Sequence, residues 1–343
     1  MSLRVIAKEA GVSPSTVSLA LRGSQKIPEE TRLRVAQIAE RLGYRPNAKV
    51  TELMSQVRLS RAGKPTACLG VVSFYAQPRP WETATALRRI FDGMVGWAED
   101  LGYRLEPIWV RAPNLTIRRV CSILDTRGIE GLICLGSPDL KENFPPELDH
   151  YAVVAHGVSV AGSLHRVLTN AAGDMWRALD AIYALGYRKP GLAIGTEETV
   201  PNRDAYISAY LGSCYKRWNN PSPVPLLTFL RSAPDAAPGW LEAHTPDVVV
   251  VVDDTAGIME FGIQLQRRGI RWPTDIGIVA ISPILEGTGF AGLQENQHLI
   301  GGWMVEMLVD RLLHHELGMP ATPRIQLVDS QWLKGSSLQL SLG

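Results

Sequence analysis

The sequence predicts two parts of different fold class: an all-α N-terminal domain that contains a helix-turn-helix, and an α/β core of two doubly wound halves built on parallel sheets. Three short helical patterns in residues 1–45, two of them separated by a glycine turn, indicate the first part. From Thr66 onward, apolar strands alternate with amphipathic helices in roughly ten units, which is too many for one compact sheet. The 343 residues suffice for two or three domains of about 100–200 residues each.

The charge of the chain is unevenly distributed. Residues 1–64 carry 12 basic and five acidic side chains, a net charge of +7, whereas the remainder carries −6. Such asymmetry indicates an appended module that binds nucleic acid or another anionic surface, although a basic helical face can also be simply solvated. The net charge of +1 for the whole chain therefore does not exclude a DNA partner.

Cysteine usage, hydropathy and motif content exclude several classes of protein. Cys68, Cys121, Cys134 and Cys214 form no C-x-x-C pair, so neither a disulfide scaffold nor a cysteine zinc module is expected, and a reducing cytoplasm fits. No apolar run approaches about 18 residues and no basic-then-apolar segment opens the chain, so we expect neither membrane insertion nor secretion. Nucleotide-binding loops, nucleophile elbows and metal-spaced histidines are missing, so we expect no enzyme activity, no cofactor and no metal.

The first two helices of the N-terminal domain are expected at Arg4–Ala10 and Pro14–Leu21, joined by a turn at 11–13. Ser13 suits the cap of the second helix because its hydroxyl can accept a free first-turn N–H, and Pro14 suits the first helical position. We therefore expect a defined start for the second helix.

The spacing of Ala7, Gly11 and Val17 is typical of a helix-turn-helix. The alanine lets two helices approach, the glycine permits a positive φ in the turn, and the valine fills the angle between the helices. A third helix is expected at Glu29–Leu42, where apolar residues repeat at Val35, Ile38, Ala39 and Leu42. Pro28 stands where a capping serine would be favoured, so we expect weak capping of this helix.

The strings "VIAKEAGVSPSTVSLAL" and "LGYRPN" resemble the DNA-binding headpiece of lactose-repressor (LacI/GalR-type) transcription regulators. The resemblance is strong over residues 3–54 and looser over the rest of the chain. It implies a DNA-binding domain at 1–45 whose second helix lies in the major groove. It assigns DNA contacts to Ser13, Pro14, Ser15, Thr16, Ser18, Leu19 and Arg22. Leu19 departs from the polar residue common in relatives, so no operator sequence is carried over.

Residues 46–64 are expected, by the same resemblance, to form a hinge helix and a linker. A helix at 46–56 is too short to be stable alone in water, because isolated helices below about 12 residues are marginal. In the family this helix orders when a dimer meets its operator. Asn47 would cap it, and Leu53 aligns with the leucine that enters a minor-groove base step. An exposed Leu53 could instead dock on the core.

Residues 65–340 are expected to form the α/β core, which the resemblance likens to periplasmic sugar-binding proteins. In that fold the chain crosses three times between two halves, which we place at 65–160 with 294–320 and at 161–293 with 321–340. Within these halves the sequence predicts strands in 67–74, 103–110, 131–135, 150–157, 189–195, 224–230, 247–254 and 276–282. The helices are expected at 83–101, 115–127, 170–185, 203–218, 236–243 and 256–268.

Ligand contacts are implied by the resemblance at the carboxyl ends of strands, where α/β sheets bind ligands. Arg203 matches an arginine that holds a ligand hydroxyl or carboxylate, and Asp254 matches an aspartate that accepts sugar hydroxyls. Phe74, Tyr75 and His156 fall where relatives place other effector contacts. Each could instead be structural, as a core aromatic, a surface arginine or a helix cap. "AISP" at 280–283 and Tyr206 depart from the family pattern, which argues against a standard sugar effector.

The sequence as a whole favours a cytoplasmic, homodimeric regulator that binds a pseudo-palindromic DNA operator and responds to a small molecule, a sugar or related metabolite. A repressor is the first interpretation, and a ligand-dependent activator is the alternative. A receptor or an enzyme without a DNA role would have no use for the N-terminal helix-turn-helix. No leucine-heptad helix follows the core, so a dimer is expected rather than a tetramer.

Overall fold

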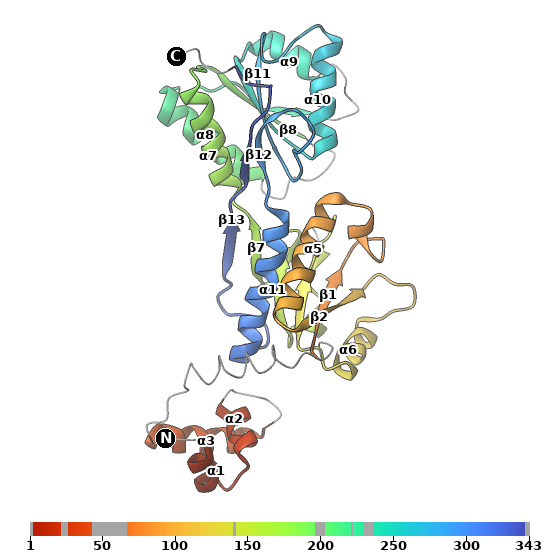
Figure 1. Cartoon of the computed structure of the whole chain (residues 1–343), viewed down its shortest axis with the longest axis vertical. Helices are drawn as coiled ribbons and strands as arrows, with labels where there is room; N and C mark the ends of the chain where they lie inside the picture. The colour runs from red at the N-terminus through yellow and green to blue at the C-terminus, as the bar shows by residue number, and fades with distance from the viewer. Residues whose placement is uncertain are drawn as a thin grey trace.

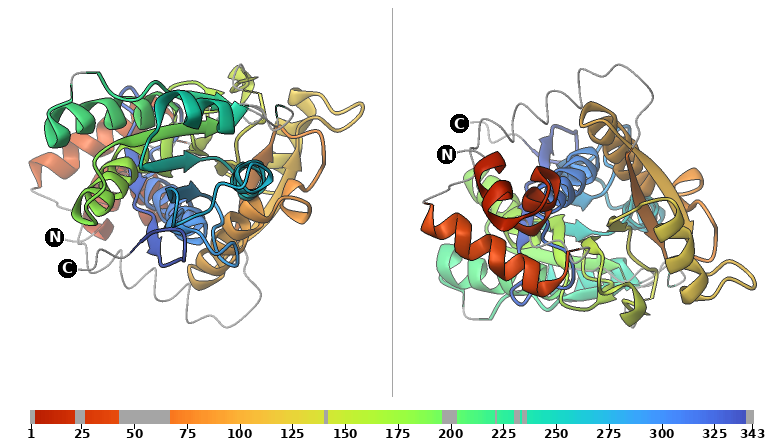
Figure 2. Two further views of the ribbon diagram at one scale, coloured as in Figure 1. Left: turned by 90° about the horizontal axis from the view of Figure 1, so that it is seen from above. Right: turned by 90° about the horizontal axis from the view of Figure 1, so that it is seen from below.

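The N-terminal domain consists of three short helices that pack around one small core. The computed structural model describes residues 3–21, 27–42, 67–139, 142–195, 203–220, 222–229, 233 and 236–339. The three helices are α1 Leu3–Ala10, α2 Pro14–Leu21 and α3 Glu29–Arg41, which form a compact cluster (Figure 2). Their buried residues are Ile6, Ala7, Ala10, Val17, Ala20, Val35, Ile38 and Ala39. The predicted helices of this domain are thereby confirmed.

The turn between α1 and α2 has the geometry that the sequence predicts. Gly11 has φ +67°, a left-handed conformation that glycine adopts without strain. The N–H of Val12 donates to the carbonyl of Ala7 at 3.0 Å, which closes the end of α1. At α3, Pro28 occupies the N-cap without a side-chain hydrogen bond, as expected. Acidic Glu29 and Glu30 in its first turn favour the positive end of the helix dipole.

The core contains two six-stranded sheets, and each forms the centre of one subdomain (Figure 1). Subdomain one has the strand order β13-β7-β5-β3-β1-β2, all parallel. Its strands are β1 Ala67–Ser73, β2 Tyr103–Trp109, β3 Gly131–Cys134, β5 Ala152–His156, β7 His165–Thr169 and β13 Ile325–Val328. The helices on its two faces are α5 Thr85–Asp100 with α11 Gln297–His314, and α6 Ile117–Thr126.

Subdomain two has the strand order β14-β12-β11-β10-β8-β9, parallel except for β14. Its strands are β8 Pro190–Gly195, β9 Leu227–Phe229, β10 Val248–Val252, β11 Gly277–Ser282, β12 Ala291–Gln294 and β14 Gln331–Leu333. Helices α7 Ala171–Ala184 and α8 Arg203–Trp218 cover one face, while α9 Ala236–His244 and α10 Thr255–Arg267 cover the other. The predicted two-part α/β core is therefore confirmed.

Short elements complete the described chain. A two-stranded sheet pairs β4 Glu142–Asn143 with β6 Val160–Ala161. Two 3₁₀ turns lie at η1 Pro80–Glu82 and η2 Pro146–Leu148. Within the described residues, no helix has the length and apolar character needed to cross a membrane.

The chain crosses between the subdomains three times, at positions that differ from the predicted divisions. Because β7 and β13 pair in the sheet of subdomain one, the crossings lie after Thr169, after Gln294 and after Val328. The divisions predicted at 160 and 320 were therefore wrong by about ten residues. The cause is local: His165 and Arg166 give β7 a weak apolar pattern, and β13 is an edge strand of only four residues, three of which are not buried.

Helices α5 and α11 pack closely because glycines lie at their contact. A Cβ added to Gly301 of α11 would lie 2.0 Å from the carbonyl oxygen of Ile90 in α5. A Cβ added to Gly93 of α5 would lie 2.0 Å from the carbonyl oxygen of His298 in α11. Since real Cβ atoms do not approach backbone this closely, the spacing of the two helices depends on both glycines.

Candidate DNA-binding and ligand-binding sites

The start of α2 carries the hydroxyl groups that the sequence predicts for DNA contact. The N–H of Thr16 donates to the Ser13 hydroxyl at 3.1 Å, so Ser13 caps the helix as predicted. The hydroxyls of Ser13 and Thr16 lie 2.8 Å apart. Pro14, Ser15, Ser18 and Leu19 all belong to α2. The predicted contacts Arg22, Asn47 and Leu53 lie outside the described residues.

The basic side chains on α1 and α3 are of two kinds: some pair with an acidic side chain of the same domain, and others can contact an anionic partner. Arg41 pairs with Glu9, which ties the end of α3 to α1. Lys8 and Arg34 are exposed and can face an anionic partner. Because surface ion pairs contribute little stability, the Arg41 pair mainly orients the two helices.

The predicted ligand contacts of subdomain one lie where its strands end, as expected for residues that follow parallel strands. Phe74 directly follows β1 and is only 3% exposed, within the apolar cluster that also holds Val72 and Ile108. Tyr75 is half-buried, and its carbonyl accepts a hydrogen bond of 3.0 Å from the Trp109 indole N–H. The buried position of Phe74 favours a core role, whereas Tyr75 has ring surface near the strand ends.

His156 is the last residue of β5 and lies near Gly136 and Ser159, which belong to two neighbouring loops. Gly136 beside it has φ +99°, and an added Cβ there would lie 3.0 Å from the Ser159 hydroxyl oxygen and 3.9 Å from His156 Nδ1. Burial lowers the pKa of His156 to about 4, partly opposed by its hydrogen bond with the Leu135 backbone. The imidazole is therefore neutral near pH 7 and can donate and accept one hydrogen bond each.

In subdomain two, Arg203 and Asp254 begin helices at the carboxyl ends of strands. Arg203 starts α8, is exposed, and donates from Nη2 to the Thr228 hydroxyl at 3.2 Å. Asp254 is the N-cap of α10, since its Oδ1 accepts from the Gly257 N–H at 2.8 Å. Asp254 thus caps a helix, which is the structural alternative to ligand contact, and its carboxylate lies at the strand ends.

Asp253, next to Asp254, is buried and packs between β8 and α10. Its Oδ1 accepts from the Asp254 N–H at 2.7 Å. A Cβ added to either Gly195 or Gly257 would lie 1.9 Å from Asp253 Oδ2. These two glycines therefore provide the space in which the Asp253 carboxylate is held.

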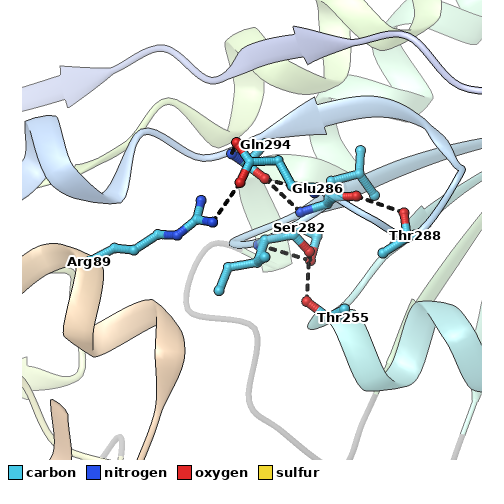
Figure 3. Close-up of polar contacts among 8 residues, drawn as sticks. Arg89, Thr255, Ser282, Glu286, Thr288 and Gln294 are labelled. Carbon is cyan, nitrogen blue, oxygen red and sulfur yellow. Dashed lines mark hydrogen bonds and ion pairs between the residues drawn. The ribbon is translucent and has the colours of Figure 1, made fainter. Parts of the chain in front are cut away.

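The loop between β11 and β12, at 283–290, belongs to subdomain two and contacts subdomain one through a side chain that the sequence does not predict. Gln294 Oε1 accepts from the N–H groups of Leu285 and Glu286 at 2.8 and 3.0 Å, and Gln294 Nε2 donates to Glu286 Oε1 at 3.1 Å. Glu286 also pairs with Arg89 of α5 at 2.6 Å (Figure 3). The loop thereby presents a fixed carboxylate to the other subdomain.

Two hydroxyls hold the start of this loop. The Thr255 hydroxyl donates to the Ile284 carbonyl at 2.6 Å, and the Ser282 hydroxyl donates to the same carbonyl at 3.1 Å (Figure 3). The one sequence signal was Gln294, a polar residue in an otherwise apolar strand. The described residues contain no cluster of three or more His, Cys, Asp or Glu side chains that could hold a metal ion.

Comparison with known proteins relates the N-terminal domain to one family. The family described as "Bacterial regulatory proteins, lacI family" matches residues 2–47. Catabolite control protein A of Streptococcus mutans is 42% identical over 67 residues, which are 20% of this chain and 18% of that protein. The HTH-type transcriptional regulator PtxS of Pseudomonas plecoglossicida is 23% identical over 92% of this chain and 91% of its own.

Solved structures share the fold of the whole chain. The transcriptional regulator CelR in complex with cellobiose has a TM-score of 0.60 at 20% identity, covering 98% of this chain and 99% of its own. The lac repressor dimer bound to operator and the anti-inducer ONPF has a TM-score of 0.58 at 17% identity, covering 99% of both chains. These relatives and neighbours are transcription regulators, not enzymes. The N-terminal residues 2–47 thus match the lacI family of bacterial regulatory proteins, and the two-subdomain core shares its fold with these solved regulators.

Proposed function

We propose that this protein is a transcriptional repressor that binds a pseudo-palindromic DNA operator as a homodimer, under control of a small ligand bound between the two subdomains. One observation supports the proposal: the same chain contains a helix-turn-helix, whose second helix is capped by Ser13, and an α/β core of two subdomains. One part suits reading DNA and the other suits closing around a ligand.

The DNA-binding role is assigned to α2 and to the segment that follows the headpiece. Ser13 and Thr16 place hydroxyls at the N-terminal end of α2, where helix N–H groups also favour phosphate. Lys8 and Arg34 add positive charge to the same domain. Residues 46–64, with Asn47 and Leu53, are proposed to form the hinge helix and linker that act at the centre of the operator.

The ligand-binding role is assigned to the strand ends that face each other across the subdomains. Arg203, with its planar guanidinium, suits a hydroxyl pair or a carboxylate, and Asp254 suits hydroxyl donors. Neutral His156 and the ring of Tyr75 suit an uncharged, partly apolar ligand. A sugar or a related metabolite with several hydroxyls combines these features, in keeping with the cellobiose bound by the structural neighbour CelR.

A dimer would bury apolar surface that the single chain leaves exposed. Met259 and Ile263 lie four residues apart on α10 and are 40% and 38% exposed. Residues at this spacing share one helix face, so they offer a continuous apolar contact for a second copy. Two headpieces would then match two half-sites of one operator.

The proposed function is tested by selecting DNA with the purified full-length protein. We expect a random-sequence duplex library to yield a palindrome whose half-site centres are about one helical turn apart. Enrichment of no common sequence, measured by sequencing after several rounds, would contradict the proposal. Turnover of a sugar by the same preparation would instead favour an enzyme.

The ligand site is tested with Arg203→Ala, matched by Asp204→Ala at the next exposed position of α8. A panel of sugars that includes cellobiose is first screened by thermal shift on the wild-type protein. We expect R203A to weaken binding of the hit by about 10–100-fold, because charged hydrogen bonds are lost, while operator affinity without ligand stays unchanged. D204A should retain both properties. A normal ligand response in R203A would show that the site lies elsewhere.

A further inference from the structure

Strand β13 ends the sheet of subdomain one with an open edge that carries apolar side chains. It pairs with β7 on one side, and no strand in the described part of the chain pairs with its other side. Ile325 and Leu327 of this strand are 62% and 49% exposed. An exposed apolar edge can pair with a strand of another molecule, so proteins usually protect such edges with charges, proline or a covering element.

The edge strands at the other three ends of the two large sheets are better protected. The sequence of β2 contains Arg104, Glu106 and Pro107. The exposed residues of β9 and β14 are the polar Thr228 and Gln331. Among these four edge strands, β13 is therefore the one whose exposed side chains are both apolar, and this difference needs a physical explanation.

The backbone of the two apolar residues faces the open edge. The carbonyls of Arg324 and Val328 accept hydrogen bonds of 2.9 Å from backbone N–H groups of β7 and of the residue that follows it. Successive residues of a strand direct their backbone groups to opposite sides, so the even-numbered residues of β13 face β7. The N–H and C=O groups of Ile325 and Leu327 therefore point away from the sheet, where another strand can pair with them.

Two copies of this edge are complementary to each other about a two-fold axis. When two β13 strands lie antiparallel with the axis at Gln326, Ile325 stands opposite the partner's Leu327, and the same holds in reverse. Opposite residues whose backbone groups face each other exchange two N–H···O=C bonds, so both pairs are hydrogen-bonded. The apolar side chains of each pair then lie side by side on one face of the joined sheet. A two-fold contact of this kind uses the same surface patch on both copies.

The charges beside β13 fit the same arrangement. Arg324 precedes the strand and Asp329 follows it, and both are exposed. In the antiparallel pair, Arg324 comes within one residue of the partner's Asp329. The contacts of Arg324 with acidic side chains of its own subdomain are long, at 3.7 and 3.9 Å, so it can also reach a partner. Gln326, at the axis, lines a hollow of about 440 Å³ together with Met307 and Leu313 of α11, which leaves room for the side chains there.

We propose that β13 is a self-association surface, at which a second copy of the chain adds its own β13 and joins the two sheets of subdomain one. The contact is small, because only two residues of each strand exchange hydrogen bonds, so we expect a weak association that depends on concentration. It lies on subdomain one, whereas the dimer proposed above uses α10 of subdomain two. The two contacts together would join two dimers into a tetramer.

The proposal is tested first by cysteine cross-linking of the full-length protein in a Cys121→Ser background; Cys68, Cys134 and Cys214 are buried. Gln326→Cys places two thiols at the axis, where the Cα atoms of a non-hydrogen-bonded antiparallel pair lie about 4.5 Å apart. A disulfide spans Cα distances of about 4.4–6.8 Å, so this variant should form a covalent pair of chains under mild oxidation. The product is measured on a non-reducing gel.

Ile325→Cys and Leu327→Cys, each alone, are the matched controls. Each thiol then lies diagonally from its copy, at a Cα distance of about 7–8 Å, which a disulfide does not span. We therefore expect Q326C to cross-link at least about tenfold faster than either control. An equal mixture of I325C and L327C should cross-link as well, because these two residues stand opposite each other.

The second measurement is the mass in solution by sedimentation equilibrium, from about 1 to 200 μM protein without DNA or ligand. Leu327→Lys adds a charge to the edge, and Leu211→Lys makes the same change on α8, where the leucine is 42% exposed. We expect the mass of the parent to rise with concentration, and L327K to weaken this association at least about tenfold, while L211K behaves as the parent.

The α10 contact and the β13 contact are separable in this measurement. If α10 holds no dimer, the parent rises from monomer to dimer rather than from dimer to tetramer, and L327K still removes that step. Three results would overturn the proposal: equal cross-linking of Q326C and its controls, a parent mass that is independent of concentration, or equal association of L327K and L211K. Circular dichroism checks the fold of each variant, and the cross-linking result decides the matter if L327K does not fold.

Discussion

Gly301→Ala is expected to destabilise subdomain one by about 3 kcal/mol, near the upper end of typical overpacking costs. The added methyl would lie 2.0 Å from the Ile90 carbonyl oxygen, so α11 and α5 would have to separate along their contact. Loss of packing there reaches the buried residues that both helices contribute to the core. Scanning calorimetry should show the midpoint of the affected transition lowered by roughly 5–10 °C.

Gly96→Ala is the matched control for this prediction. Gly96 lies on α5 as well, but a Cβ there would meet nothing within 4 Å. The same chemical change should therefore stabilise the helix by about 0.5–1 kcal/mol, the ordinary gain of alanine over glycine. Gly93→Ala, which meets the His298 carbonyl at 2.0 Å, should behave like G301A. Equal effects of G301A and G96A would mean that the two helices are not held by close backbone contact.

Ile6→Ala is expected to unfold the headpiece and leave the core intact. Ile6 is 0% exposed and belongs to a small core of alanine, valine and isoleucine side chains. Removing a buried isoleucine side chain costs about 2–5 kcal/mol, and a domain of this size rarely has more than about 3–5 kcal/mol to lose. If the proposed dimer binds its operator with both headpieces, operator affinity should fall at least about tenfold, because both headpieces must be folded to contact the DNA. Loss of protection against trypsin at Lys8 and Arg34 would show the unfolding directly.

Leu33→Ala provides the control for Ile6→Ala. Leu33 lies on α3 and is 58% exposed, so its truncation removes a similar apolar side chain without opening a cavity. Operator binding and trypsin resistance should both remain at the parent level. A folded headpiece with normal affinity in I6A would contradict the role of this small core, and the unchanged melting of the core domain serves as an internal reference.

The sequence was informative wherever the physical cause of structure is local. The spacing of Ala7, Gly11 and Val17 predicts the helix-turn-helix because each residue acts within two neighbouring helices, and the structure has this arrangement. The run of five valines at 248–252 predicts a buried strand, which is β10. Such signals depend on periodicity and turn chemistry, so they are visible within a short window.

The sequence was uninformative wherever partners come from distant parts of the chain. Arg89 and Glu286 are 197 residues apart, and nothing near either residue indicates that they pair. Asp174 and Ser330 are hydrogen-bonded although 156 residues separate them, because the first and third crossings converge, and the predicted divisions misplaced these crossings together with β7 and β13. Phe74 shows a further limit, since the order of residues at a strand end does not reveal which ring turns into the core.

The third crossing has a consequence for how the protein is made on the ribosome. β13 and β14 are the outermost strands of the two sheets, although they lie only a few residues apart in the chain. Until these residues emerge, β7 and β12 are unpaired edges on two otherwise assembled sheets, and exposed edges recruit other chains. Nascent chains that stall shortly before Ile325 should therefore be the form most prone to aggregation. Synthesis of one short segment then supplies the missing edge strand of each sheet.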